Sequence, residues 1–230
     1  MGSVTKSQKQ NIKSPDGNSL ALFVDGNDGE LKLKDVRGNV QKITEYLPSI
    51  PATLNYGLFS QRKDSTPVTA TTEERSLIGK GIGTLSVPAN GFSIGDSFEA
   101  NLIGELSCVG TAQLDIRIKT TGGILLADTQ VVNMDVTTNK KWRLNIVFTI
   151  RELGEAGTAV IVSGGLFSYN KNSGSNFEGS NFSIINNSTF DTTIDNTLLV
   201  TAQWNTNNAG NSIHSEIFTL NTIFYHLKNE

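Results

Sequence analysis

The chain has 230 residues, with 19 basic and 22 acidic side chains and a formal net charge of −3. These charges are spread along the chain without a basic tract, which argues against a nucleic-acid partner. Residues 1–14 are polar and lack the apolar segment of a signal peptide, and no apolar run is long enough to span a membrane. We therefore expect a protein that is made in a reducing cytoplasm, with no nucleic-acid partner and no membrane insertion.

The composition favours an all-β fold. Gly, Asn, Thr and Ser are abundant, and only 18 % of the residues are charged. Such a chain is typical of many short strands joined by turns. The single cysteine, Cys108, excludes an intramolecular disulfide framework.

The N-terminal region predicts a polar arm followed by a small sheet. Residues 1–18 are polar, and we expect an arm that orders only against a partner. Residues 19–46 predict a three-strand meander, with strands at 19–24, 30–36 and 40–43. Asp25-Gly26 and Gly38-Asn39 supply turns, because these pairs tolerate positive φ angles. A meander with one apolar face needs a cover, either a second copy of the chain or a partner surface.

The next region, residues 47–80, predicts an extended connector. It contains Pro48, Pro51 and Pro67 and the Thr-rich stretch 66–72. We expect at most a short helical turn at 73–77.

From residue 81 onward, apolar and polar residues alternate, which is the period of strands buried on one face. The clearest segment is 141–153, in which Trp142, Leu144, Ile146, Phe148 and Ile150 share a face. Further strands are expected at 98–106, 114–119, 159–166, 182–185, 190–194, 197–204 and 213–227. The spacing of strands and turns predicts a β-sandwich, for which a jelly roll is the natural arrangement.

The last predicted strand is apolar on both faces. One face carries Ile217, Ile223 and Tyr225, and the other carries Phe218, Leu220 and Phe224. Such a strand either is buried on both sides within its own domain or lies at a subunit interface. Together with the meander, it favours the interface and hence an oligomer.

One motif resembles a catalytic one. Gly95-Asp96-Ser97-Phe98 is similar to the nucleophile motif of GDSL-type hydrolases. Such a serine needs a histidine base that a carboxylate orients. The two histidines, His214 and His226, have Asn211 and Ile223 three residues before them in place of an aspartate. We therefore interpret the motif as a turn that enters a strand, and we predict no catalytic residue.

The remaining motifs predict no cofactor and no metal. Residues 79–84 (GKGIGT) do not fit a phosphate-binding loop, so their glycines are expected to allow close strand approach or a bulge. Residues 25–30 (DGNDGE) lack the EF-hand spacing, which favours a hairpin turn over a calcium site. The histidines and the cysteine do not form a zinc pattern. Phe177 and Phe182 are expected either to form a contact surface or to plug the end of the sandwich.

The stretch from Tyr56 onward resembles a family of fibre and structural proteins of tailed phages. The resemblance covers roughly three quarters of the chain, and its segments include 57–61 (GLFSQ), 83–92 (GTLSVPANGF), 95–98 (GDSF), 116–119 (IRIK), 148–151 (FTIR) and 211–218 (NSIHSEIF). Residues 25–43 are similar to the N-terminal anchor module of phage fibres, including trimeric head fibres of the crAss-like phages.

The resemblance implies a non-enzymatic virion protein that is made in the bacterial host. Residues 1–46 would be the virion anchor, 47–80 the connector and 81–230 a jelly-roll head domain. It implies a homotrimer that binds capsid or tail proteins, with a head fibre favoured over a tail fibre, and a head that binds host-surface or mucus glycans or a host surface protein. Two alternatives stay open: a capsid decoration protein that only stabilises the lattice, and a glycan-active enzyme with a pair of carboxylates.

Overall fold

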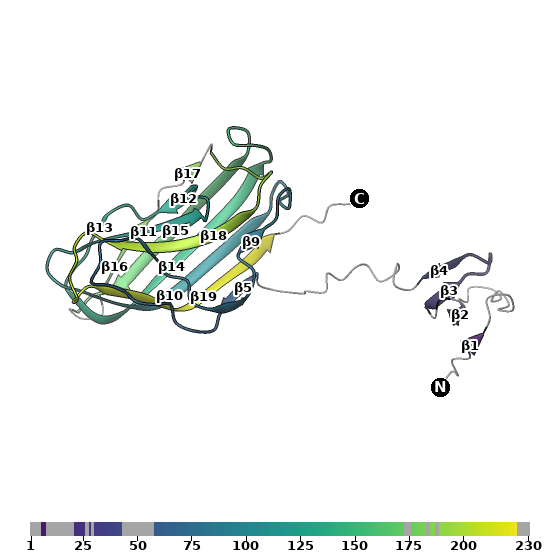
Figure 1. The fold of residues 1–230 in the computed structure, drawn as a ribbon, viewed down its shortest axis with the longest axis horizontal. Helices are drawn as coiled ribbons and strands as arrows, with labels where there is room; N and C mark the ends of the chain where they lie inside the picture. The colour runs from purple at the N-terminus through teal and green to yellow at the C-terminus, as the bar shows by residue number, and fades with distance from the viewer. Residues whose placement is uncertain are drawn as a thin grey trace. The chain divides into compact units, whose positions relative to one another are not determined.

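The computed structural model describes residues 6–7, 21–25, 28, 30–42, 58–172, 176–182, 185–186 and 189–224. The chain divides into two compact units, Met1–Asn55 and Tyr56–Glu230. All regular secondary structure in these described residues is β-strand (Figure 1). The predicted all-β fold is therefore confirmed.

The first unit contains a four-stranded sheet in the order β1-β2-β3-β4. Its strands are β1 (Lys6–Ser7), β2 (Ala21–Asp25), β3 (Leu31–Lys34) and β4 (Val40–Lys42). The last three form the antiparallel meander that the sequence predicts. The sequence also predicts that the preceding arm orders only against a partner, but β1 pairs with β2 in parallel. Ladder hydrogen bonds form between backbones, so a polar sequence can join a sheet without an apolar pattern.

One face of this small sheet is apolar. The register places Leu22 opposite Leu33 and Val24 opposite Leu31, so these four side chains share a face. Leu22 is 55 % exposed and Leu31 is 40 % exposed. We refer to these four residues as the apolar face of the first unit.

The second unit is a sandwich of two sheets, which are the two layers of the larger body in Figure 1. The nine-stranded sheet has the order β16-β15-β14-β10-β19-β5-β8, with β17 on β15 and β6 on β19. Its strands are β5 (Phe59–Gln61), β6 (Val68–Thr69), β8 (Gly81–Gly83), β10 (Ser97–Cys108), β14 (Thr137–Glu152), β15 (Val160–Asn170), β16 (Phe177–Asn181), β17 (Ile185–Asn186) and β19 (Ser212–Phe224).

The six-stranded sheet has the order β12-β11-β18-β7, with β13 on β11 and β9 on β18. Its strands are β7 (Arg75–Ser76), β9 (Ser86–Val87), β11 (Gln113–Thr120), β12 (Leu125–Asp128), β13 (Val132–Asn133) and β18 (Asn196–Trp204). The strand pairs within both sheets of the sandwich are antiparallel.

The core lies between the two sheets and follows the predicted alternation. The buried residues on the long strands include Ala100, Leu102, Leu106, Leu114, Ile116, Ile118, Trp142, Leu144, Ile146, Phe148 and Ile150. Removing this apolar surface from water is the main force that holds the layers together. The indole N–H groups of the two tryptophans are satisfied inside the core: Trp142 donates to the His214 carbonyl and Trp204 donates to the Val68 carbonyl, both at 3.0 Å.

The sandwich begins before residue 81, so the predicted boundary of the connector is wrong. β5 and β6 pair with β19, and β7 pairs with β18, which places residues from 58 onward in the sheets. Arg75 and Ser76 form a strand where a helical turn is predicted. Strands of two or three residues are too short to show an alternation that a sequence pattern could reveal. Residues 47–57 of the expected connector lie outside the described residues.

Two predicted strands near the end of the chain are also wrong. Residues 190–194 form an irregular segment, in which the amide and hydroxyl of Thr193 donate to Asp191 Oδ1 at 2.7 and 2.6 Å. Such local bonds compete with a strand ladder. The segment 182–185 is not one strand, since β16 ends at Asn181 and β17 begins at Ile185.

Candidate functional site

Ser97 lies at the start of β10, far from the histidine that the structure describes. Its hydroxyl donates to the Gly95 carbonyl at 3.1 Å and lies 3.0 Å from Thr149 Oγ1. His214 pairs with Glu105, which at a rise of about 3.3 Å per residue is about 26 Å further along β10. His226 lies outside the described residues. The structure therefore brings no base to Ser97 from His214, and the turn carbonyl is its partner.

The acidic loop after β2 is the predicted hairpin turn. The Asp25 amide donates to the Glu30 carbonyl at 2.8 Å, and β2 pairs with β3. The Lys32 ammonium bonds Asp25 at 2.8 Å and also Asp28, and hydrogen bonds to these two carboxylates raise the pKa of Lys32. The positive charge between these two carboxylates, whose sequence resembles a calcium-binding loop, is therefore the ammonium of Lys32.

The glycines of residues 79–84 allow close strand approach, as predicted. A Cβ atom on Gly81 would lie 2.3 Å from the Phe59 ring and 2.4 Å from the Ser60 carbonyl oxygen. Gly83 has a φ of 92°, in the region that favours glycine. These glycines let β8 pair with β5 at the edge of the sheet.

The cysteine and the two phenylalanines that the sequence singles out do not form a site together. Cys108 is buried, its thiol donates to the Asp135 carbonyl at 2.7 Å, and burial raises the pKa of the thiol. Phe182 is buried in the core, whereas Phe177 on β16 is 72 % exposed. Among the described residues, no group of three or more metal-ligating side chains occurs. The same residues contain no helix long and apolar enough to cross a membrane.

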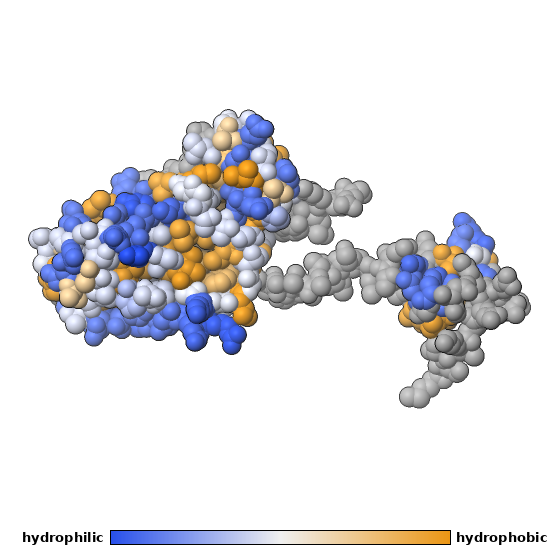
Figure 2. Space-filling view, in the orientation of Figure 1, coloured by the Kyte–Doolittle hydropathy of each residue, from blue (hydrophilic) through white to orange (hydrophobic). Residues whose placement is uncertain are grey.

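A polar groove lies on the outer face of the six-stranded sheet, with a volume of about 220 Å³. Alternate residues of β11 point outward, so Gln113, Asp115 and Arg117 line the groove. Gln203 of β18 pairs with Asp115, and Asn205 follows β18 at the end of the groove. Figure 2 shows strongly hydrophilic residues gathered over β11, at the place where Figure 1 labels that strand.

Arg117 connects the charged side chains beside the groove. Its Nη1 donates to Gln203 Oε1 at 2.7 Å and to Glu74 Oε2 at 3.2 Å, and its Nη2 donates to Asp115 Oδ2. Lys119 Nζ lies 2.7 Å from Glu74 Oε1. These bonds connect β11, β18 and the residue that precedes β7, and they fix the guanidinium in one orientation.

The two carboxylates beside Arg117 have opposite pKa shifts. Burial opposes ionisation of Glu74, but hydrogen bonds from Lys119 and Thr201 outweigh it and lower the pKa of Glu74. Burial raises the pKa of Asp115, against the attraction of Arg117. The difference follows the number of donors, because Lys119, Thr201 and Arg117 all bond Glu74, whereas Arg117 is the donor to Asp115.

Asp115 has one oxygen that lacks a donor. Its side chain is 14 % exposed, and Oδ1 is buried without a hydrogen-bond partner among the described residues. Leaving a buried acceptor unsatisfied costs about 1–3 kcal/mol. Because Oδ1 has almost no exposed surface, a molecule in the groove would meet the amide and guanidinium groups of its lining rather than this oxygen.

Comparison with known proteins adds no family. A scan against protein-family models and a search of curated proteins both find no match to the chain. Any function of the groove is therefore inferred from its own residues.

The sequence predicts the orientation of some of these side chains but does not predict the groove. Alternation places Asp115, Arg117 and Lys119 on the polar face of one strand, and the structure confirms that placement. Glu74 is missed, because it lies in the segment that the sequence predicts as a connector. A two-residue edge strand leaves no signal from which its sheet could be found.

Proposed function

We propose that this chain is a non-enzymatic fibre protein of a tailed-phage virion, anchored by residues 1–46 and carrying a β-sandwich that binds glycans of the host surface or mucus. The resemblance to phage fibres motivates the proposal and favours the capsid head over the tail. The functional form is a homotrimer that assembles on the particle.

The observation that carries the proposal is the apolar face of the first unit. A sheet of four short strands buries little of its own apolar surface, so a partner that covers its apolar face would stabilise it. Leu22 and Leu31 are 55 % and 40 % exposed on that face. An exposed apolar patch marks a protein interface, and a virion protein or a second copy of the chain would cover it.

The strand order of the second unit supports a jelly roll. The order β5-β19-β10-β14 in one sheet faces β7-β18-β11-β12 in the other. The chain changes sheet between β10 and β11, between β12 and β14, and between β18 and β19. The hairpin of β15 and β16 extends the first sheet beyond β14. Jelly rolls are common in viral capsid proteins and in lectins.

The polar groove supports glycan binding. Its amide, guanidinium and carboxylate groups are held by bonds to one another, so little side-chain entropy is lost when a ligand binds. Several copies on one particle would raise the avidity of a weak single site.

Attachment is tested by deleting residues 1–46 from the fibre of an intact phage. The truncated chain should keep a β-type circular dichroism spectrum and should be missing from purified particles. Decoration of particles at the wild-type level would contradict the anchor assignment.

Glycan binding is tested on an array of bacterial and mucin glycans with the wild type and with an Asp115→Ala variant. We expect weak binding that the variant loses, whereas Val136→Ala, an exposed position outside the groove, should bind as the wild type does. Particles that carry the protein but bind no glycan would favour the decoration role.

A further inference from the structure

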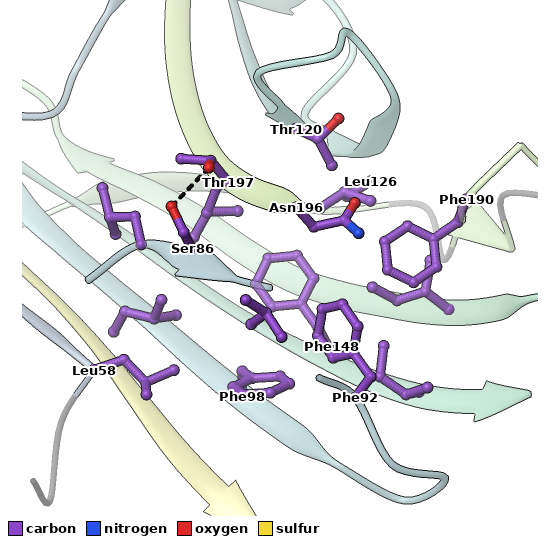
Figure 3. A pocket seen from close by; sticks show the side chains of 16 residues that line it. Leu58, Ser86, Phe92, Phe98, Thr120, Leu126, Phe148, Phe190, Asn196 and Thr197 are labelled. Carbon is purple, nitrogen blue, oxygen red and sulfur yellow. Dashed lines mark hydrogen bonds between the residues drawn. The ribbon is translucent and has the colours of Figure 1, made fainter. Parts of the chain in front are cut away.

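The apolar cavity between the two sheets beside β9 is a gap in the core rather than a ligand site. Its volume is about 60 Å³, and aromatic side chains form much of its wall (Figure 3). An engineered apolar cavity that binds benzene has a volume of about 150 Å³. A ring of that size therefore does not fit between the sheets, and the larger hollows lie on the surface of the sandwich.

One of these hollows lies where the chain crosses from one sheet to the other, between β6 and β7. β6 pairs with β19 in the nine-stranded sheet, and β7 pairs with β18 in the six-stranded sheet. The hollow has a volume of about 450 Å³, within the range of about 300–1,000 Å³ that is usual for ligand pockets. It shares no lining residue with the polar groove. We call it the hydroxyl hollow, because its walls carry the hydroxyl groups of Thr66, Thr69, Thr71 and Ser76 together with the guanidinium of Arg75.

Both ends of the segment that forms the hydroxyl hollow are fixed in the core. Val68 is 1 % exposed, and its carbonyl accepts a hydrogen bond from Trp204 Nε1 at 3.0 Å. Leu77 is 0 % exposed, and its amide donates to the Val200 carbonyl at 2.8 Å. The walls are therefore in place before a ligand arrives, which reduces the entropy lost on binding.

The polar side chains of the hydroxyl hollow can all donate hydrogen bonds. Thr71 Oγ1 accepts from the Glu73 amide at 3.0 Å, and Ser76 Oγ accepts from the Ile78 amide at 3.1 Å. Each of these hydroxyls keeps its own O–H for another acceptor. The described residues that line the hollow include no carboxylate. Such a lining suits a ligand that is rich in acceptor oxygens.

Arg75 supplies the positive charge of the hydroxyl hollow. Its side chain is 61 % exposed, and its Nη2 donates to the carboxylate of Glu73, which does not line the hollow. A guanidinium has five N–H donors, so the bond to Glu73 leaves donors for a ligand. Carboxylates suit this group, because they accept two parallel N–H bonds from an arginine. Glu73 competes for the guanidinium but does not occupy the hollow.

Three further cations lie next to the hydroxyl hollow. Arg62, Lys63 and Lys80 are exposed, and the amides of Arg62 and Lys63 both donate to the Lys80 carbonyl, at 2.8 and 3.1 Å. Lys63 precedes Thr66 by three residues, which span at most about 11 Å of chain. That distance is close to the screening length of about 10 Å at 0.1 M salt. With Asp64 as the carboxylate among them, these three cations leave a net positive charge that attracts anions to the hollow.

We propose that the hydroxyl hollow binds an acidic sugar, such as a uronic acid unit of a polysaccharide. The sugar carboxylate pairs with Arg75, and the Thr and Ser hydroxyls donate to the other oxygens of the sugar. The site is separate from the polar groove and can be measured on the isolated chain, so it does not depend on the proposed function.

Two probes with the same ring test the proposal on the full chain. Methyl glucuronide and methyl glucoside differ only at the exocyclic carbon, which is a carboxylate in the first and a hydroxymethyl group in the second. In methyl NMR spectra, the glucuronide should cause a saturable shift of Ile78, which lines the hollow. Ile116 in the core and Ile94, which is 61 % exposed outside the hollow, should not shift.

The glucoside should bind about five- to tenfold more weakly, a factor suited to a charge-assisted bond of a partly exposed guanidinium. Equal affinity of the two probes would overturn the proposal. So would the absence of a saturable Ile78 shift with the glucuronide.

Variants of the ion pair separate binding from a structural role. Arg75→Gln should lower the affinity for the glucuronide to that for the glucoside, whereas Arg151→Gln, at an exposed position of β14 outside the hollow, should leave it unchanged. Glu73→Gln should raise the affinity about two- to fivefold, because it removes the competing carboxylate. A purely structural role of the pair requires equal losses in Arg75→Gln and Glu73→Gln.

A third variant distinguishes the hydroxyl hollow from the polar groove. Asp115→Ala should bind the glucuronide as the wild type does, so a loss of neutral glycans in that variant concerns the polar groove alone. An unchanged amide spectrum shows that each variant is folded. Wild-type affinity for the glucuronide in a folded Arg75→Gln chain would overturn the proposal.

Discussion

Removal of residues 1–80 should unfold the sandwich, whereas removal of residues 1–55 should not. The longer deletion takes away β5, β6 and β7, and the shorter one ends at the boundary between the two compact units. The difference between the two deletions measures how much residues 56–80, which the sequence predicts as part of a connector, contribute to the stability of the sandwich.

The magnitude follows from the core residues that the longer deletion removes. Phe59, Val68 and Leu77 are 9 %, 1 % and 0 % exposed. Burying a large apolar side chain contributes about 1.5–3 kcal/mol, so the three together contribute about 5–9 kcal/mol. Domains have a total free energy of unfolding of about 5–15 kcal/mol. The loss is therefore comparable to the whole stability of the sandwich.

The same deletion leaves buried donors without partners. The indole of Trp204 loses the Val68 carbonyl, and the hydroxyl of Ser215 loses the Leu77 carbonyl, to which it donates at 2.6 Å. The Ser215 amide loses Ser65 Oγ at 2.9 Å. Each unsatisfied group adds to the destabilisation.

Urea unfolding followed by tryptophan fluorescence measures the effect, because Trp142 and Trp204 are both buried. The chain of residues 56–230 should show a cooperative transition, and the chain of residues 81–230 should have the emission of exposed tryptophan without denaturant. Equal transition midpoints for the two chains would refute the reasoning.

Two further predictions concern single positions, and a third concerns assembly. Glu74→Gln should lower the free energy of unfolding at pH 7 by about 1 kcal/mol, the upper range for a partly exposed ion pair. Because the pKa of Glu74 is lowered in the folded chain, this difference should be present above the usual pKa of 4.5. In an acid denaturation series, the difference should disappear as the pH falls through the lower pKa of the folded chain. Ser97→Ala should lower the free energy of unfolding by about 1 kcal/mol or less, because its bonds to Gly95 and Thr149 are lost. The variant should not change the rate of hydrolysis of a chromogenic ester. A turnover that vanished in this variant would contradict the non-enzyme proposal. Light scattering of the full chain should give three times the monomer mass. Ile217 and Ile223 on the outer face of β19 are 50 % and 54 % exposed, so the double variant Ile217→Lys, Ile223→Lys should reduce this mass if that face is an interface. An unchanged mass would place the interface elsewhere.

The sequence by itself determined the fold class and the inward faces of the long strands. In β14, every second residue from Trp142 to Ile150 is apolar, and the structure buries all five. A period of two is a local property that survives in any antiparallel sandwich, because successive side chains of a strand point to opposite faces. The meander was predictable for the same reason, together with turn pairs such as Asp25-Gly26.

Only the tertiary structure decided where the sandwich begins and which side chains meet on its surface. β7 has two residues, and its place beside β18 depends on Thr201 and Ala202, more than a hundred residues later. That pairing brings Glu74 to Arg117 and Lys119, and so completes the cluster beside the polar groove. The orphaned oxygens of Asp115 and Asn196 depend on the same packing. Hydrogen bonding and burial at such sites arise from neighbours that are distant along the chain, and the periodicity of a strand carries no information about them.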